Sequence, residues 1–199
     1  MKKEFEITDK SIITKMLQDS EYGTLALSHQ DKPYSLPINF VYFQDVIYFH
    51  GSKSGRKIDI IKQNSLASFS VVEAYSIIPS YFSSNENLAC PATQAFKSII
   101  IDGKIEFVKE YDEKADALSA LMQKLQPEGK YKSLHDKCYQ KMINATTIYK
   151  LILHDIKAKF KFGQHLNQER FDMIISNLEK RGSDIDLATI KMMKEQRAN

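Results

Sequence analysis

The chain is poor in cysteine, and this excludes several classes of protein. Its 199 residues include only Cys90 and Cys138, which lie far apart with no CxxC pair and no metal-site spacing. A disulfide framework is therefore not expected, and a reduced intracellular compartment fits better. We expect both cysteines to be buried as small apolar residues, the usual place of a free cysteine.

Long apolar runs are also missing. No stretch approaches the roughly 18 consecutive apolar residues of a membrane span. Residues 1–6 lack the apolar region of a secretion signal. The sequence therefore predicts a soluble, cytoplasmic protein with no membrane partner.

Neither sign of charge is in large excess. The net charge is only +3, from 28 basic and 25 acidic side chains. A dedicated nucleic-acid binder would cluster its cations along one face, so we expect no nucleic-acid partner. Internal repeats and low-complexity tracts are absent, and the length predicts a single domain over residues 1–199.

Hydrophobic periodicity predicts both helices and strands. Helices are expected from residue 8 to 22, from 56 to 63 and from 112 to 126, followed by a C-terminal helical extension at about 165–199. Six strands are expected at 24–28, 35–43, 46–49, 65–72, 96–108 and 146–162, the first three forming an antiparallel meander. Residues 73–95 show no clear period and read as a long loop, either functional or disordered. The pattern favours an α+β fold built on a closed or partly closed antiparallel barrel with flanking helices.

The segment from Tyr48 to Lys57 concentrates the most chemistry. An aromatic strand runs into a loop with two glycines, two serines and three cations, and a helix begins near Arg56. Glycines let the backbone turn tightly, and the first turn of a helix directs free N–H groups at an anion. The segment therefore predicts a phosphate site.

Individual residues of this region leave alternatives open. Arg56 and Lys57 stand where the helix dipole disfavours cations, which indicates a bound anion; the alternative is a solvated helical turn. His50 is either hydrogen-bonded to its own backbone at a strand end or placed beside a ligand. Pro37 interrupts an apolar strand, so that strand should be bulged or at an edge, with its backbone exposed.

Several motifs together resemble a known family. They are Lys32-Pro33-Tyr34, Leu36-Pro37-Ile38-Asn39-Phe40, Tyr48-Phe49-His50-Gly51 and Gly55-Arg56-Lys57-Ile58-Asp59. In this order they resemble the FMN-binding split-barrel flavoproteins related to pyridoxamine 5′-phosphate oxidase, closest to the nitroimidazole-resistance branch. The resemblance runs from about residue 22 to 108 and continues weakly through 159–163.

That resemblance implies a six-stranded antiparallel split β-barrel and a homodimer with FMN in each of two clefts between the subunits. The implied cofactor-binding residues are Pro37, Ile38, Asn39 and Phe40 along the flavin ring, His50, Gly51, Ser52, Arg56 and Lys57 around the phosphate, Ser98 near the ring and the aromatic Phe160. It also implies an oxidoreductase that takes electrons from a nicotinamide donor and passes them to a small-molecule substrate, a nitro compound in that branch. The oxidase branch's C-terminal arginine signature has no match here, so oxidation of pyridoxine phosphate is not expected.

Two other functions stay open. A related split-barrel branch binds and degrades haem, and His50, His154 or His165 could serve as the axial ligand. A flavin-binding sensor without catalysis is the other. The histidines lack HxH or HExxH spacing, and neither a catalytic triad nor paired carboxylates can be assigned, so we name no metal site and no catalytic side chain. Any catalysis should reside in the cofactor.

Overall fold

The computed structural model describes residues 2–84, 86 and 88–198. Their contacts form two compact units, each made of several segments. The larger unit comprises Lys10–Val71 and Ile100–Ile156, and the smaller unit comprises Met1–Asp9, Val72–Ile99 and Lys157–Asn199.

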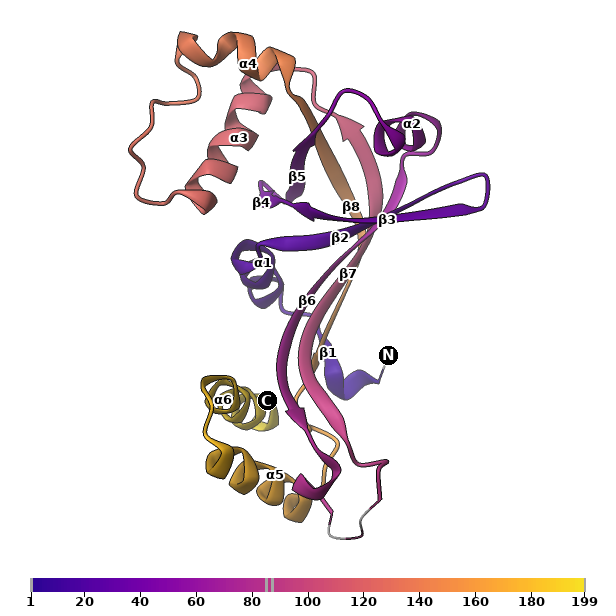
Figure 1. Cartoon of the computed structure of the whole chain (residues 1–199), viewed down its shortest axis with the longest axis vertical. Helices are drawn as coiled ribbons and strands as arrows, with labels where there is room; N and C mark the ends of the chain where they lie inside the picture. Colours follow the sequence, from indigo (N-terminus) through magenta and orange to yellow (C-terminus); the bar gives the residue numbers. More distant parts are fainter. Residues whose placement is uncertain (1, 85, 87, 199) are drawn as a thin grey trace. The chain divides into compact units, whose positions relative to one another are not determined.

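Figure 1 shows the strands and helices, coloured along the chain. The strands are β1 (Glu6–Ile7), β2 (Tyr22–His29), β3 (Lys32–Asn39), β4 (Val41–Phe43), β5 (Val46–Gly51), β6 (Leu66–Ile78), β7 (Thr93–Phe107) and β8 (Thr147–Lys161). The helices are α1 (Lys10–Asp19), α2 (Arg56–Gln63), α3 (Tyr111–Leu125), α4 (Gln140–Ala145), α5 (Gln168–Arg181) and α6 (Asp184–Ala198), with short 3₁₀ turns at Lys3–Phe5, Ser80–Phe82 and Lys137–Tyr139. The helical extension expected at 165–199 is thus present as α5 and α6.

The described strands form one eight-stranded sheet in the order β3-β2-β6-β7-β8-β5-β4, with β1 added beside β8. Because Phe40 alone separates β3 from β4, the two ends of this path are adjacent in the chain and the sheet must curl back on itself. Among the described residues β3 and β4 do not pair, so the barrel stays open. The α+β fold class with a mainly antiparallel sheet is confirmed.

The strand expectations need three corrections. The sheet has eight strands where six were expected, because the segment 35–43 breaks at Phe40 and the two-residue β1 was missed. Both antiparallel pairings of the expected meander are present, β2 with β3 and β4 with β5, but the break at Phe40 interrupts it and places the two pairs at opposite ends of the sheet path. Much of the loop expected at 73–95 is strand, because β6 continues to Ile78 and β7 begins at Thr93.

In the larger unit, the hydroxyl of a buried tyrosine links α3 to the sheet. Tyr48 on β5 donates its hydroxyl to Glu113 Oε1 on α3 (3.1 Å), and Lys150 Nζ on β8 binds the same carboxylate oxygen at 2.9 Å. Burial, together with the charge of Glu113, raises the pKa of Tyr48 to about 12. Around this contact, Val41, Ile148 and Leu121 form part of one apolar cluster.

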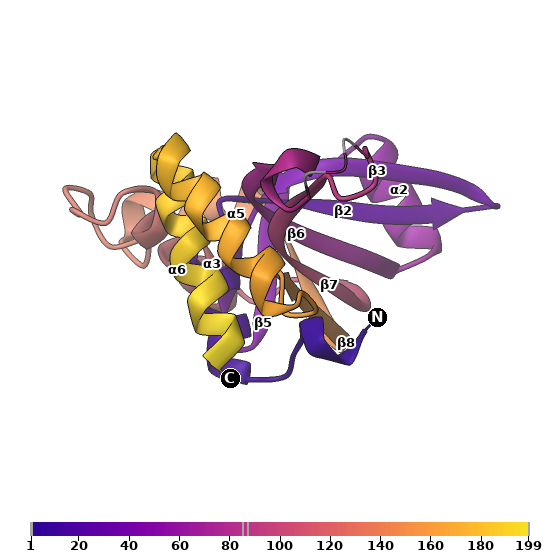
Figure 2. The ribbon, with the colours of Figure 1, turned by 90° about the horizontal axis from the view of Figure 1, so that it is seen from below.

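In the smaller unit α5 and α6 lie side by side (Figures 1 and 2). Their buried apolar residues are Phe171, Ile174, Ile175, Leu178, Ile190 and Met193. A buried carboxylate joins both helices to β6. Asp186 is 0% exposed and accepts bonds from Arg181 Nε (2.9 Å), Ser183 Oγ (2.6 Å) and Ser76 Oγ (2.5 Å). These donors, Arg181 foremost, hold its pKa well below its usual range despite burial.

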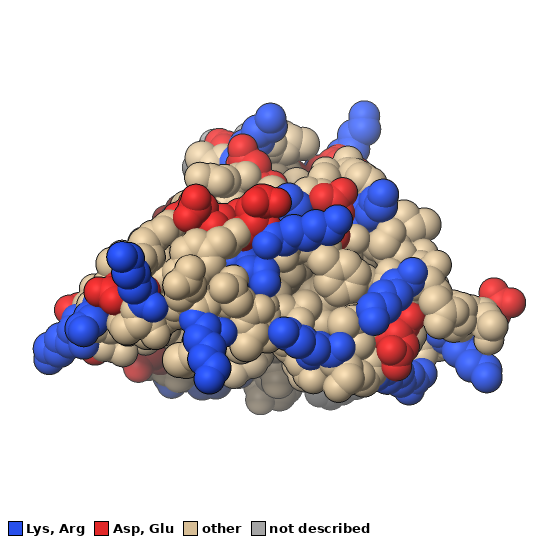
Figure 3. All heavy atoms as spheres, turned by 90° about the horizontal axis from the view of Figure 1, so that it is seen from above, with Lys and Arg blue, Asp and Glu red and all other residues tan. Residues whose placement is uncertain are grey.

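Several absences concern only the described part of the chain. No helix there is long and apolar enough to cross a membrane, and no group of three His, Cys, Asp or Glu residues there could hold a metal ion. Cys90 and Cys138 are free and exposed, so the expectation that they are buried is wrong. On the face shown in Figure 3, cationic and anionic side chains are interspersed.

We predict that Asp186→Asn lowers the free energy of unfolding by about 2–3 kcal/mol at pH 7, because it leaves the Arg181 guanidinium without its counter-charge. The folded-state pKa of Asp186 is depressed, so its contribution is complete above the unfolded pKa near ~3.9 and is lost as the pH falls below it. Urea unfolding followed by circular dichroism at pH 7 and pH 3 measures both effects. The exposed Asp184→Asn at the start of α6 is the control; equal losses in the two variants would contradict the prediction.

Candidate functional site

The loop between β5 and α2 leaves the first turn of α2 free to bind an anion. Gly55 precedes α2 with φ 111° and ψ 170°, a conformation essentially restricted to glycine. No described side chain caps this end of the helix. The backbone N–H groups of Arg56, Lys57 and Ile58 therefore have no partner inside the helix and remain available as donors.

Lys57 holds a half-buried ammonium over two aromatic rings. Its Nζ lies 4.8 Å from the ring centroid of Tyr149 and 5.5 Å from that of Phe49, and these rings stack at 4.9 Å. A Cβ at Gly51 would overlap this ammonium, so a larger residue there would force the end of the Lys57 side chain to move. Burial alone lowers the pKa of Lys57, and none of the described carboxylates pairs with it. A desolvated cation with only π-electrons beside it is a strong attractor for an anion.

Arg56 connects the first turn of α2 to the edge of the sheet. Its guanidinium carbon lies 4.4 Å above the ring centroid of Tyr34 on β3, and its Nη2 makes a long contact of 3.4 Å with the Pro33 carbonyl oxygen. The side chain is exposed and keeps donors directed to solvent. The loop and β3 are thus neighbours within the larger unit.

The backbone of β3, more than its side chains, is available to a ligand. Pro37 is exposed and lies opposite Thr24 in an unbroken register, so the proline marks an edge strand and not a bulge. Ile38 is buried, Asn39 Nδ2 donates to the Glu21 carbonyl (2.8 Å), and Phe40 is 0% exposed. Among the described strands β3 pairs only with β2, which leaves its outer backbone groups open to a ligand.

The rest of the loop is shaped by two internal bonds. Tyr149 Oη donates to the Ser52 carbonyl oxygen (3.0 Å), and the Ser54 N–H donates to Ser52 Oγ (3.2 Å). Ser52 itself is exposed. The Ser52 carbonyl is thus fixed by Tyr149, while the Ser52 hydroxyl stays at the surface.

His50 does not join this group. Successive strand residues point to opposite faces, and Phe49 occupies the face where Lys57 lies. His50 lines an apolar cavity of about 360 Å³ with residues of α3 and α4, among them Leu121 and Met142. The structure therefore separates His50 from the cations with which the sequence grouped it.

Ser98 and Phe160 belong to the smaller unit. Ser98 is half-buried on β7. Phe160 on β8 is 2% exposed, and Lys97 Nζ lies 5.4 Å from its ring centroid. The structure therefore gives Phe160 a packing role inside that unit.

Sequence reasoning missed two aromatic residues, Tyr149 and Tyr34, that support the cations. Tyr149 lies directly opposite Phe49 in the pairing of β5 with β8, a contact between residues far apart in the chain that no local pattern reveals. Tyr34 could have been found, since it belongs to the Lys32-Pro33-Tyr34 motif at the start of a hairpin strand.

The sequence of the chain is similar to those of known proteins. The sequence model of the family described as pyridoxamine 5′-phosphate oxidase matches residues 9–160. The protein "Protease synthase and sporulation protein PAI 2" of Bacillus subtilis (strain 168) is 26% identical over 188 residues, which is 89% of this chain and 87% of that protein.

Solved structures show the same fold. An FAD and haem binding protein from Mycobacterium smegmatis has a TM-score of 0.66 at 20% identity, over 79% of this chain and 74% of its own. The flavocytochrome Anf3 from Azotobacter vinelandii has a TM-score of 0.65 at 19% identity, over 82% and 73%. A candidate 5-nitroimidazole antibiotic resistance protein from Bacteroides thetaiotaomicron VPI-5482 has a TM-score of 0.63 at 19% identity, over 77% and 85%.

Proposed function

The chain belongs to the pyridoxamine 5′-phosphate oxidase family, and from this premise we propose that it binds FMN and acts as an FMN-dependent oxidoreductase. The observation that carries the proposal is the half-buried Lys57 ammonium at the open end of α2, which has no described carboxylate partner. Two of the similar structures are named for FAD or as a flavocytochrome, which supports a flavin in this fold.

The residues of the loop fit a phosphate ester. Its oxygens would accept bonds from the N–H groups of Arg56, Lys57 and Ile58 and from the two cationic side chains. Ser52 Oγ stands at the surface of the same loop as a further donor. The exposed Asp59 later in the first turn has no ion pair with Lys57, so it does not neutralise the cation before a phosphate arrives.

The edge strand fits the ring end of the same ligand. An isoalloxazine ring carries donors and acceptors along one edge, and the outer backbone of residues 37–39 on β3 offers groups of both kinds, except at Pro37, which lacks an N–H. Arg56 lies against Pro33 and Tyr34 of this strand, so one ligand can reach both. Bound FMN would supply the electron transfer, and the protein would fix its position and exclude water.

A second copy of the chain would complete the site. The larger unit leaves Tyr22, Leu66 and Ile100 exposed at 62%, 62% and 48%, and apolar side chains of this size exposed on strands suit a subunit interface. We propose a homodimer with a nicotinamide electron donor and a small-molecule acceptor, such as a nitro compound, in the cleft.

We predict that Arg56→Ala combined with Lys57→Ala weakens FMN affinity by about 2–4 kcal/mol, roughly 30- to 1,000-fold in Kd, since two charge-assisted contacts are lost. Titration of the apoprotein by flavin absorbance and fluorescence quenching measures this. Lys62→Ala, an exposed cation at the other end of α2, is the matched control and should leave Kd unchanged. An unaltered Kd in the double variant would remove the phosphate assignment.

Catalysis is tested separately from binding. FMN-loaded protein should oxidise NADH when a nitroaromatic acceptor is present, with two electrons leaving each NADH and entering the acceptor. The Arg56→Ala/Lys57→Ala variant should oxidise NADH more slowly at sub-saturating FMN, and excess FMN should restore the rate. Normal FMN binding without turnover of any nicotinamide donor would indicate a flavin sensor and contradict the enzyme proposal.

The apolar cavity beside His50 favours haem binding as a second candidate function. Its lining joins one imidazole, which could ligate haem iron, to apolar side chains such as Leu121, Met122 and Met142, which could cover the macrocycle. Haem titration should then give a Soret band that His50→Ala shifts or abolishes while His154→Ala does not. The absence of a Soret band would end this candidate without affecting the flavin proposal.

A further inference from the structure

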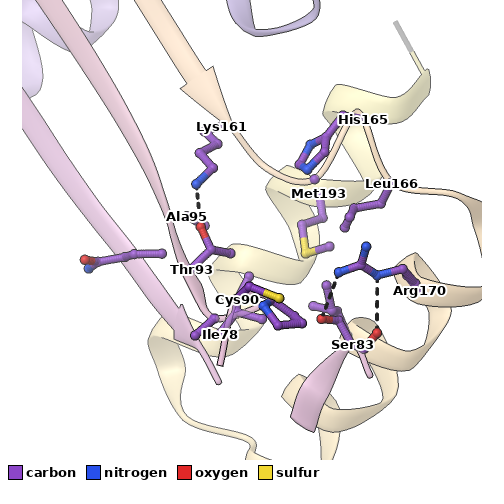
Figure 4. A pocket seen from close by; sticks show the side chains of 15 residues that line it. Ile78, Ser83, Cys90, Thr93, Ala95, Lys161, His165, Leu166, Arg170 and Met193 are labelled. Carbon is purple, nitrogen blue, oxygen red and sulfur yellow. Dashed lines mark hydrogen bonds between the residues drawn. The ribbon is translucent and has the colours of Figure 1, made fainter. Parts of the chain in front are cut away.

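A cavity of about 420 Å³ lies within the smaller unit (Figure 4). Its walls come from the ends of β6, β7 and β8 and from α5 and α6. The family match ends at residue 160, and the cavity's cationic side chains all follow it in the chain. A volume of this size is typical of small-molecule sites.

Three basic side chains face this cavity, and none of the described carboxylates does. Lys161 ends β8, His165 follows it in the connection to α5, and Arg170 lies in the first turn of α5. No aspartate or glutamate occurs among the described residues that line the cavity. The neighbouring hollow does contain Glu169 and Glu86, and it shares Arg170 with the cavity.

The two permanent cations are held in place by neutral groups. Arg170 Nε lies 3.3 Å from the Ser83 carbonyl oxygen and its Nη2 3.4 Å from Ser83 Oγ, both long contacts. Lys161 Nζ donates to Thr93 Oγ1. Figure 4 shows both side chains directed at these partners from opposite sides of the cavity. Each keeps donors that these bonds do not use.

The cations also repel one another. Burial lowers the pKa of His165, and the charges of Lys2, Lys161 and Arg170 lower it further, against a single opposing carboxylate, Glu4. Burial and Lys159 lower the pKa of Lys161. The cavity therefore holds an excess of positive charge that a bound anion would relieve.

Part of the cavity wall is apolar. It is formed by Ile78 from β6, Leu166, Ile174 from α5 and Met193 from α6. A bare inorganic ion would leave this wall without a partner, whereas an organic body would cover it. We propose that this cavity binds a small organic anion, a carboxylate or a phosphate monoester, with its charge among Lys161, His165 and Arg170 and its apolar body against Ile174 and Met193.

Isothermal titration of the full chain with benzoate and phenyl phosphate tests the proposal, with neutral benzamide for comparison. Both anions should bind one per chain, and benzamide at least about tenfold more weakly. Arg170→Gln and Lys161→Met should each weaken benzoate binding roughly 10-fold, one charge-assisted bond being lost. Arg170→Lys should keep most of the affinity.

Two controls locate the binding. Lys191→Met removes an equal charge from an exposed position on α6 and should have no effect. The double variant Arg56→Ala/Lys57→Ala in the larger unit should also bind benzoate normally, which separates this cavity from the proposed phosphate loop. Equal weakening by Lys191→Met, or loss of binding in the double variant, would overturn the proposal.

A measurement without variants guards against misfolding. Benzoate should shift the backbone amide resonances of Ala95 and Gly163, which line the cavity, and leave those of Gly51 and Gly55 unchanged. Benzoate affinity should rise as the pH falls from 8 to 5.5, because His165 gains its proton. The charged groups around His165 are Lys2, Glu4, Lys161 and Arg170. His165→Gln should abolish the pH dependence. No shifts at millimolar benzoate, or shifts at Gly51 and Gly55 alone, would refute the site.

Discussion

The passage of the chain through Phe40 is the constraint on which the larger unit depends. In this single residue the chain leaves β3 at one end of the sheet path and enters β4 at the other. Phe40 is buried, its ring meets Phe69 edge-on at 4.9 Å, and Lys124 Nζ binds its carbonyl oxygen at 3.1 Å. Because Phe69 and Lys124 both hold this point, the sheet stays curled. β3 therefore remains an exposed edge strand. The loop that follows β5, and α2 after it, lie beside this edge.

Several of the partly buried cations in this structure fall into two kinds. Lys150 is matched by Glu113 at 2.9 Å, Lys97 by Glu73 at 3.2 Å and Arg181 by Asp186 at 2.5 Å. Each of these pairs joins neighbouring elements, so its role is structural. Lys57 has aromatic rings in place of a carboxylate, and Lys161 has a hydroxyl. Desolvating a cation without a counter-charge costs free energy. That cost argues for an external anion at both places.

Local chemistry was readable from the sequence, and long-range pairing was not. The α2 loop, the edge position of Pro37 and the two C-terminal helices follow from residue types that act within a few positions of one another. The break at Phe40 was hidden because a buried aromatic continues an apolar pattern without interruption. The position of His50 depended on which face of β5 meets α3, and the cavity of the smaller unit depends on three strand ends and two helices. Periodicity carries no information on such contacts.

The strand partners explain why the sequence placed His50 with the cations. Along the chain His50 and Lys57 are seven residues apart, and a loop containing two glycines could bring them together. Within β5, however, Phe49 and His50 must point to opposite faces. Tyr149 stacks on Phe49 and so assigns that face to Lys57, while Tyr48 bonds to Glu113 and assigns the other to α3. Two interactions outside the loop thus decide that Lys57 lies on the aromatic face of β5 and that His50 faces an apolar cavity. The α2 turn and the His50 cavity are therefore separate places of different character, one cationic and one apolar.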